Sequence, residues 1–374
     1  MLELDFTLRN VMLGAALLGV SSGVLGSFAL LRQQSLLGDA LAHAALPGVC
    51  LGFLLSGSRE PLPIFLGALV SGALAAAFTL LLTNRSRLKT DAALGISLSL
   101  FFAFGLVLLT FIQGRTGSGQ AGLEAFLFGQ AAAIVPSDVR LMSVVALTAL
   151  LTVAALWKEF KLLTFDPQFA ASLGFPRVGL ELLLTSILAF AIVIGLQLVG
   201  VVLMAAIIIA PAAAARQWSD SLGQMVGLAA LFGALAGVTG AVVSSSGRGL
   251  ATGPLIVIAA SLIALASLMF APERGLIAAG YRARRARREL AQQRVLLDMY
   301  GLALTHGDPA YPSESGMLGA LYGGSAAAQL GRLEAAGLAE RTTHMQEEGT
   351  HYRLTETGWA QAEATLNSLG NRHA

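Results

Sequence analysis

Long apolar runs separated by short polar segments occupy the chain up to about residue 271. A membrane-spanning helix needs about 20 predominantly apolar residues. The stretch 179–215 is long enough for two short spans, or for one long span followed by a re-entrant piece, with Gln197 and Gly200 at its middle. We therefore expect an all-α polytopic membrane protein of about nine transmembrane helices, near residues 8–30, 40–56, 62–83, 92–112, 138–156, 179–196, 200–215, 222–243 and 253–271.

Composition supports a membrane-embedded chain. Its 374 residues are 55% hydrophobic and 12% charged, with a mean hydropathy of +0.72, whereas soluble domains carry about a quarter charged residues. The single cysteine, Cys50, excludes an intrachain disulfide and a zinc site built from cysteines. The N-terminus lacks a basic region ahead of its first apolar run. We therefore expect a retained span there rather than a cleaved signal peptide.

Basic residues predict the orientation of the bundle, because Lys and Arg accumulate in cytoplasmic loops. They cluster in segments 84–91 and 157–178, and five arginines follow the last span in segment 281–290. An extracytoplasmic N-terminus and a cytoplasmic C-terminus place all three segments on the cytoplasmic side.

Two ionisable residues stand in the apolar segment 35–49, SLLGDALAHAALPGV. Asp39 and His43 are four residues apart, so a helix would place them on one face. A buried acid costs about 2.5–3.5 kcal/mol in a span and usually faces the bundle interior or a wet cavity. One carboxylate oxygen and one imidazole nitrogen suit Zn, Mn or Fe, and a two-fold dimer would double them to four ligands. A hydrogen bond within the helix, or Asp39 capping a helix that starts at Ala40, are the structural alternatives.

Three further residues in the spans are candidates for the transport path or for hinges. Pro47 removes a backbone hydrogen bond and would bend its helix. Gln197 could line a path, although a hydrogen bond between helices is the favoured interpretation. Pro211 marks either a hinge or a helix end.

The segment 164–176, TFDPQFAASLGFP, predicts a short helix between two spans. Asp166 would cap it, Pro167 would occupy its first turn, and Gly174 would help to stop it. Phe165 and Phe169 could anchor in a partner's groove, or the helix could lie on the membrane. The chain has no Gly-x-x-x-x-Gly-Lys-Ser/Thr motif and no His-Glu-x-x-His motif, so we expect neither ATP hydrolysis nor metalloprotease activity from it.

Composition divides the chain into a transmembrane domain (1–275), a basic membrane-proximal helix (276–298) and a polar domain (299–374). Three helices, a hairpin and a last helix are expected after 276, an order similar to a winged helix-turn-helix. DNA binding is not expected, because acids outnumber Lys and Arg from Tyr311 onwards; a regulatory or protein-contact module is favoured. The predicted turn of the hairpin carries candidates for metal sensing, although a solvated polar turn explains such a loose cluster as well; they are His344, Glu347, Glu348 and His351.

Four blocks resemble, in order, the permeases of manganese/zinc/iron-type ABC importers. The first, LRQQSLLGDALAHAALPGVCLGFLL, resembles the signature Arg-Arg-x-x-x-Leu-Gly-Asp-Ala-x-Ser-His-Ala-x-Leu-Pro-Gly, with Gln33 and Ala42 as departures. The others are FKLLTFDPQFAASLGFPRV, AIVIGLQLVGVVLMAAIIIAPAAAAR and ATGPLIVIAASLIALASLMFAPERG.

The resemblance implies a permease dimer in the bacterial cytoplasmic membrane. Its implied partners are a second permease subunit, a cytoplasmic ATPase dimer and an extracytoplasmic metal-binding protein. Asp39 and His43 would contact the transported Mn, Zn or Fe, no cofactor would be bound permanently, and segment 164–176 would dock the ATPase. A proton-coupled secondary metal transporter and a membrane-tethered metal-responsive regulator are the alternatives.

Overall fold

The computed structural model of this chain describes residues 6–56, 61–115, 129, 134–247, 250–272, 274–322, 326–343 and 349–370. The chain forms two compact units, Met1–Leu276 and Ile277–Ala374.

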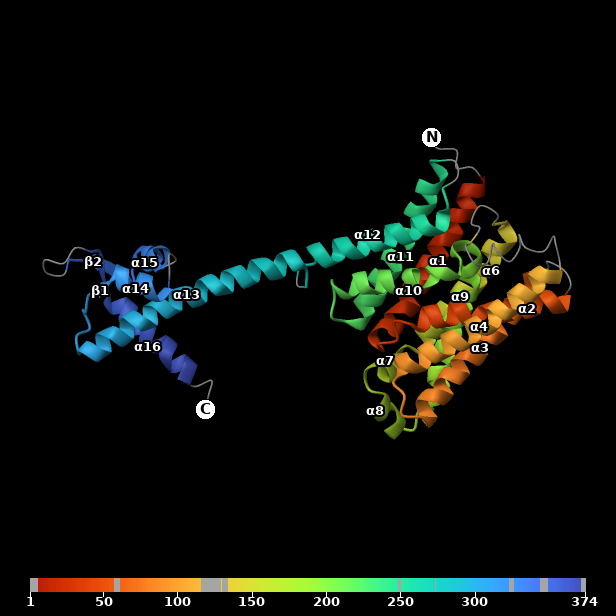
Figure 1. Cartoon of the computed structure of the whole chain (residues 1–374), viewed down its shortest axis with the longest axis horizontal. Helices are drawn as coiled ribbons and strands as arrows, with labels where there is room; N and C mark the ends of the chain where they lie inside the picture. Colours follow the sequence, from red (N-terminus) through yellow and green to blue (C-terminus); the bar gives the residue numbers. More distant parts are fainter. Residues whose placement is uncertain are drawn as a thin grey trace. The chain divides into compact units, whose positions relative to one another are not determined.

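The first unit is a helical bundle (Figure 1). Within the described residues, eight of its helices are long and apolar enough to cross a membrane, namely α1–α4, α6, α9, α11 and α12. The expected all-α polytopic fold is therefore confirmed, with eight such helices in the described residues where about nine spans were expected. The helices of this unit are α1 (Phe6–Leu31), α2 (Leu37–Ser56), α3 (Pro61–Arg85), α4 (Thr90–Arg115), α6 (Pro136–Ala155), α7 (Trp157–Phe165), α8 (Pro167–Ser172), α9 (Arg177–Val199), α10 (Val201–Arg216), α11 (Leu222–Ser245) and α12 (Thr252–Phe270).

The stretch 179–215 forms one full-length helix and one short one. Helix α9 has 23 residues, and Gly200, with a φ of 87°, separates it from the 16-residue α10. At 1.5 Å per residue α10 is about 24 Å long, less than the roughly 30 Å of a bilayer's hydrocarbon core. Pro211 lies inside α10, which continues to Arg216. Of the two interpretations of Pro211, the helix end is therefore wrong.

Close contacts between glycines bring the central helices together. A Cβ atom added at Gly19 of α1 would lie 2.1 Å from the carbonyl oxygen of Gly233 in α11. One added at Gly48 of α2 would lie 2.0 Å from the carbonyl oxygen of Gly67 in α3. Such contacts let backbones approach where larger residues would separate them. They fit the interior position of α1 and α2, whose spans are each 72% buried, compared with 22% for α6 and α12.

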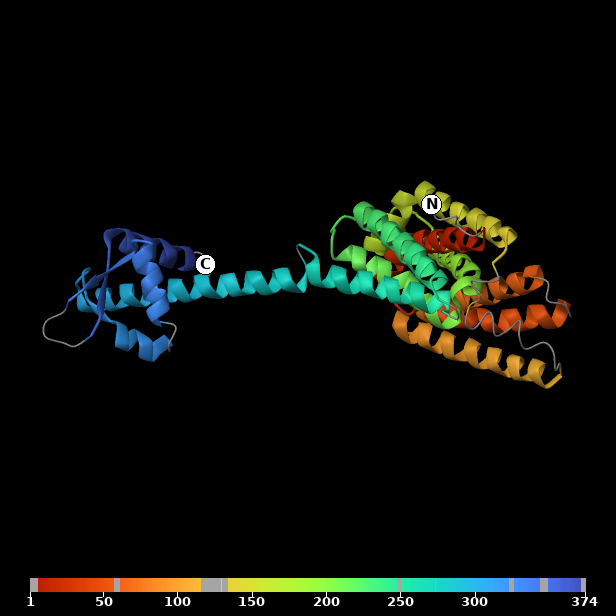
Figure 2. The same ribbon diagram turned by 90° about the horizontal axis from the view of Figure 1, so that it is seen from above.

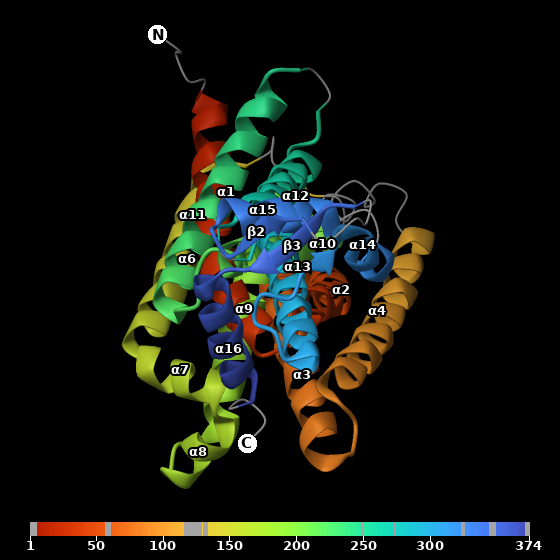
Figure 3. The same cartoon turned by 90° about the vertical axis from the view of Figure 1, so that its left-hand side faces the viewer.

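The two ends of the bundle hold different connections. Helices α7 and α8 and the α3–α4 connection lie at one end, and the start of α1 and the α11–α12 connection lie at the other (Figure 3). Seen from above, α4 and α6 lie on opposite flanks (Figure 2). The basic segments 84–91 and 157–178 are therefore at the same end of the bundle. This agrees with the expectation that basic loops face the same compartment.

The second unit combines helices with a small antiparallel sheet of strand order β1-β3-β2. The expected succession of three helices, a hairpin and a last helix is present. The two-residue strand β1 was not expected; it pairs with β3 through Ser313 and Tyr352. The elements are α13 (Leu276–His306), β1 (Ser313–Glu314), α14 (Ser315–Tyr322), α15 (Ala326–Ala335), β2 (Ala339–Thr342), β3 (His351–Leu354) and α16 (Glu356–Gly370).

Candidate metal site and docking segment

Asp39 and His43 both lie near the start of α2. The helix begins at Leu37, so Asp39 is already inside its first turn. The interpretation of Asp39 as the cap of a helix that starts at Ala40 is therefore wrong. A turn leads into α2. In this turn the Leu37 amide donates a hydrogen bond to the Gln34 carbonyl oxygen at 3.0 Å.

The two side chains contact each other on one face of α2. His43 Nε2 lies 3.2 Å from Asp39 Oδ1, and the side chains are 18% and 33% exposed. The His43 ring also meets the ring of Phe102 in α4 edge to face, with centroids 4.6 Å apart. Its Nδ1 is buried and has no hydrogen-bond partner within the part of the chain that the structure describes. Within that part, Asp39 is thus the polar partner that positions the imidazole.

The separation of the two ligand atoms fits a shared metal ion. Metal–nitrogen and metal–oxygen bonds of about 2.0–2.2 Å place neighbouring ligand atoms about 3.0–3.5 Å apart in octahedral or tetrahedral geometry. The observed 3.2 Å lies in that range, and it also fits a weak hydrogen bond. No group of three or more His, Cys, Asp or Glu gathers in the described residues. Within the described residues, one chain therefore supplies two ligands of these types to the candidate site, Asp39 and His43.

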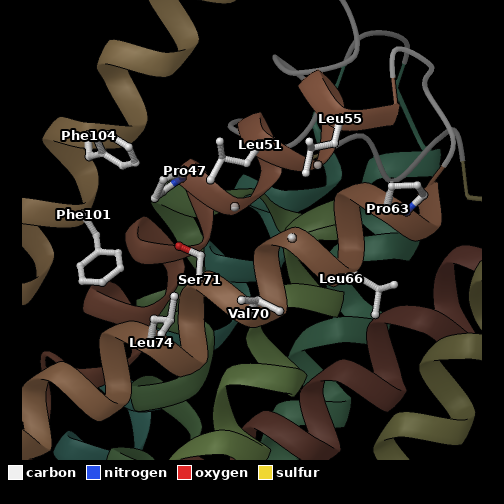
Figure 4. A pocket seen from close by; sticks show the side chains of 13 residues that line it. Pro47, Leu51, Leu55, Pro63, Leu66, Val70, Ser71, Leu74, Phe101 and Phe104 are labelled. Atoms are coloured by element: carbon white, nitrogen blue, oxygen red, sulfur yellow. The ribbon is translucent and has the colours of Figure 1, made fainter.

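An apolar groove of about 410 Å³ begins one helical turn beyond His43, at Pro47. It runs between α2, α3 and α4 (Figure 4). Ser71 is its polar side chain, and the Ser71 hydroxyl already donates to the Ala44 carbonyl oxygen at 2.6 Å. The groove therefore offers no free ligand comparable to Asp39 or His43. The labelled residues that line it are Pro47, Leu51, Leu55, Pro63, Leu66, Val70, Ser71, Leu74, Phe101 and Phe104.

The segment 164–176 contains the expected short helix, α8. Asp166 caps it, because its Oδ1 accepts a hydrogen bond of 2.9 Å from the Phe169 amide, and Pro167 is its first residue. Gly174 follows its end with a φ of 85°. Phe165 and Phe169 are 57% and 52% exposed. Helices α7 and α8 lie at one end of the bundle (Figure 3), and Phe165 at the end of α7 and Phe169 in α8 are exposed aromatic side chains there.

A buried ion pair between Arg32 and Glu181 escaped prediction. Arg32 directly follows α1, and Glu181 lies one turn into α9. Both side chains are 10% exposed. The available signal was the acid itself, since Glu181 stands in an apolar run that was expected to span the membrane.

The other predicted site residues either lie away from the Asp39–His43 pair or fall outside what the structure describes. Gln197 is in the last turn of α9, and its side chain is not described. His344, Glu347 and Glu348 fall outside the described residues. His351 is on β3 and only 2% exposed, so it does not belong to a solvated turn; its Nδ1 lies 3.2 Å from the Gly349 carbonyl oxygen.

Comparison with known proteins places the first unit among transport proteins. The ABC 3 transport family matches residues 4–271. The manganese transport system membrane protein MntC of Bacillus subtilis (strain 168) is 48% identical over 78% of this chain and 67% of that protein. The zinc transport system membrane protein TroC of Treponema pallidum (strain Nichols) is 46% identical over 75% of this chain and 94% of that protein.

A solved structure has the same fold. PsaBC from Streptococcus pneumoniae in complex with Fab matches with a TM-score of 0.64 and 34% identity, over 72% of this chain and 94% of the matched chain. The bundle described above is therefore shared with that chain.

Proposed function

The chain belongs to the ABC 3 transport family, and from this membership we propose that it is the membrane-spanning permease subunit of an importer for divalent transition metal ions. The Asp39–His43 pair carries the proposal, because it places a carboxylate and an imidazole 3.2 Å apart on an interior helix. This ligand chemistry suits Mn, Zn or Fe. Two relatives are named for manganese and zinc.

The metal would be bound weakly and passed on. Two ligands from one chain hold an ion loosely, which favours release. A second permease subunit related by a two-fold axis would supply another Asp39 and His43 and complete a four-ligand site. We therefore propose a permease dimer with this pair of residues near its axis.

Energy for transport would come from a separate cytoplasmic ATPase dimer, because the sequence has no phosphate-binding loop of its own. The capped helix α8 with Phe165 and Phe169 is the proposed docking point. An extracytoplasmic metal-binding protein would deliver the ion at the opposite end. The chain is thus a transport subunit and not itself the enzyme.

Replacing Phe169 with alanine is expected to weaken binding of the ATPase about tenfold or more, since buried aromatic anchors dominate interface energies. The measurement is the dissociation constant of the ATPase for the detergent-solubilised permease. Phe270→Ala is the matched control, because Phe270 is 68% exposed on α12 and is not assigned to docking. Equal affinities of the two variants would contradict docking at α8.

The second unit is proposed to be a cytoplasmic regulatory or protein-contact module, joined to the permease through the basic segment 276–298. Three observations support this: the compactness of the unit, the excess of acids over Lys and Arg from Tyr311 onwards, and the end of the family match at residue 271. Arginines of the basic segment would meet anionic headgroups at roughly 1 kcal/mol each.

The function is tested by metal uptake in bacterial cells that lack their own high-affinity importers. Cells that express this chain together with its ATPase and binding protein are expected to accumulate Mn, Zn or Fe from scarce supply. Cells that express the partners without the permease are the control. Equal accumulation in both would contradict the proposal.

A further inference from the structure

The Arg32–Glu181 ion pair joins two regions of the permease that are far apart in the sequence. Nη2 of Arg32 donates to Oε1 of Glu181 across 149 residues of chain. Both side chains are 10% exposed. The free-energy cost of removing two charges from water offsets much of their Coulombic attraction, so a buried ion pair contributes little net stability. Such a pair suits a role in positioning the regions that it joins.

On one side, Arg32 lies at the start of the turn that leads to the Asp39–His43 pair. The next residue, Gln33, has a φ of 56° and is the one non-glycine with a positive φ among the described residues. The turn is fixed by a 2.9 Å hydrogen bond from the Gln34 amide to the Ala29 carbonyl oxygen. Helix α2 starts directly after it and holds Asp39 in its first turn. Arg32 is therefore connected to the start of α2 by a short, hydrogen-bonded turn.

On the other side, Glu181 is close in the chain to the proposed docking segment, residues 164–176, which contains α8. The Phe175 amide donates to the Ala170 carbonyl oxygen of α8 at 3.1 Å, and the Leu180 amide donates to the Pro176 carbonyl oxygen at 2.9 Å. The first bond holds Phe175 to α8, the second belongs to the first turn of α9, and the peptide bond between Phe175 and Pro176 joins the two. A displacement of α8 would therefore reach Glu181.

Glu181 also has other cations within its surroundings. It lines a polar cavity of about 210 Å³ together with Lys89 and Arg177. Arg177 stands four residues before Glu181, on the same face of α9. Gln34, from the turn after Arg32, lines the same cavity. The carboxylate thus has one buried ion-pair partner, Arg32, and two further cations line the same polar cavity, so a second set of partners is at hand for a two-state element.

We propose that Glu181 is a positioning residue that links the docking segment to the metal pair. When the ATPase displaces α8, Glu181 leaves Arg32 for Arg177 and Lys89 in the cavity. The released turn then allows the start of α2, with Asp39 and His43, to shift. This inference rests on the permease function proposed above and adds the route by which hydrolysis would reach the metal.

The test is the ratio of metal ions transported to ATP hydrolysed, measured in vesicles that contain the full complex of permease, ATPase and binding protein. Glu181→Gln is expected to lower this ratio about tenfold, while ATP hydrolysis by the assembled complex continues. Arg32→Lys retains a cation and is expected to keep most of the coupling. Asp91→Asn is the matched control, because it removes an exposed acid near the start of α4 that has no part in the pair.

The double variant Arg32→Gln/Glu181→Gln separates positioning from stability. Removing both charges relieves the uncompensated charge that a single variant leaves, so assembly should recover. If Glu181 acts as proposed, the transport ratio stays low. A double variant with normal coupling would overturn the proposal. The proposal would also be overturned if Glu181→Gln transported as many metal ions per ATP hydrolysed as the control Asp91→Asn. If wild type transports no metal in the same vesicles, the permease function itself fails, and this inference fails with it.

Discussion

Replacement of Asp39 by alanine is expected to lower metal uptake about 100-fold or more, since loss of even an outer-sphere partner costs about 10–100-fold in metal affinity or activity. His43→Ala should have the same effect. The double variant should be little worse than either, because ligands that act as a unit are not additive. Initial uptake rates of Mn, Zn and Fe, normalised to permease in the membrane, are the measurement.

Asp91→Asn and His306→Ala serve as controls, because they remove an exposed acid and an exposed histidine outside the site. If the Asp39–His43 contact were only an intrahelical hydrogen bond, its loss would cost about 0.2–0.5 kcal/mol of helix stability. Uptake would then stay normal at equal membrane levels. That result would contradict the assignment of the pair to metal transport.

Gly48→Ala is expected to destabilise the bundle by about 3 kcal/mol or more, at the upper end of the cost of overpacking a core. The added Cβ would lie 2.0 Å from the Gly67 carbonyl oxygen, and a backbone atom of a packed helix cannot rotate away as a side chain does. Helices α2 and α3 must separate, and α2 carries the metal pair. The midpoint temperature of the detergent-solubilised protein, with the amount recovered from membranes, measures the effect.

The matched control is Gly95→Ala in α4, where an added Cβ meets no atom within 4 Å. This exchange should stabilise its helix by up to about 1 kcal/mol, because alanine has the higher helix propensity. The two substitutions add the same methyl group and are expected to change stability in opposite directions. Equal midpoint temperatures would contradict the close α2–α3 contact.

Local signals in the sequence were enough for the spans, for the Asp39–His43 contact and for the cap at Asp166. Each depends on residues a few positions apart, where helix periodicity and capping chemistry act. The start of α2 was placed too late, since the polar turn at residues 32–36 gives no sharp boundary. The sequence placed the break near Gly200 and a short segment after it, but it did not decide between two short spans and one long span followed by a re-entrant piece.

Contacts between distant segments were beyond prediction from one sequence. Arg32 and Glu181 are 149 positions apart, and nothing local to either residue identifies the other. Strand β1 has two residues, too few for an alternating pattern. Its existence depends on the backbone of β3 as a partner. Tertiary structure therefore supplies both the ion pair and the third strand.

The most direct test of the central claim is transport by the purified complex in proteoliposomes. The permease, its ATPase and its binding protein would be reconstituted, and uptake of radiolabelled Mn, Zn and Fe followed with ATP or with a proton gradient alone. The account predicts accumulation of at least one of these metals that requires ATP and all three components. Uptake driven by the proton gradient without ATP, or no uptake of any of the three by an assembled complex that hydrolyses ATP, would contradict it.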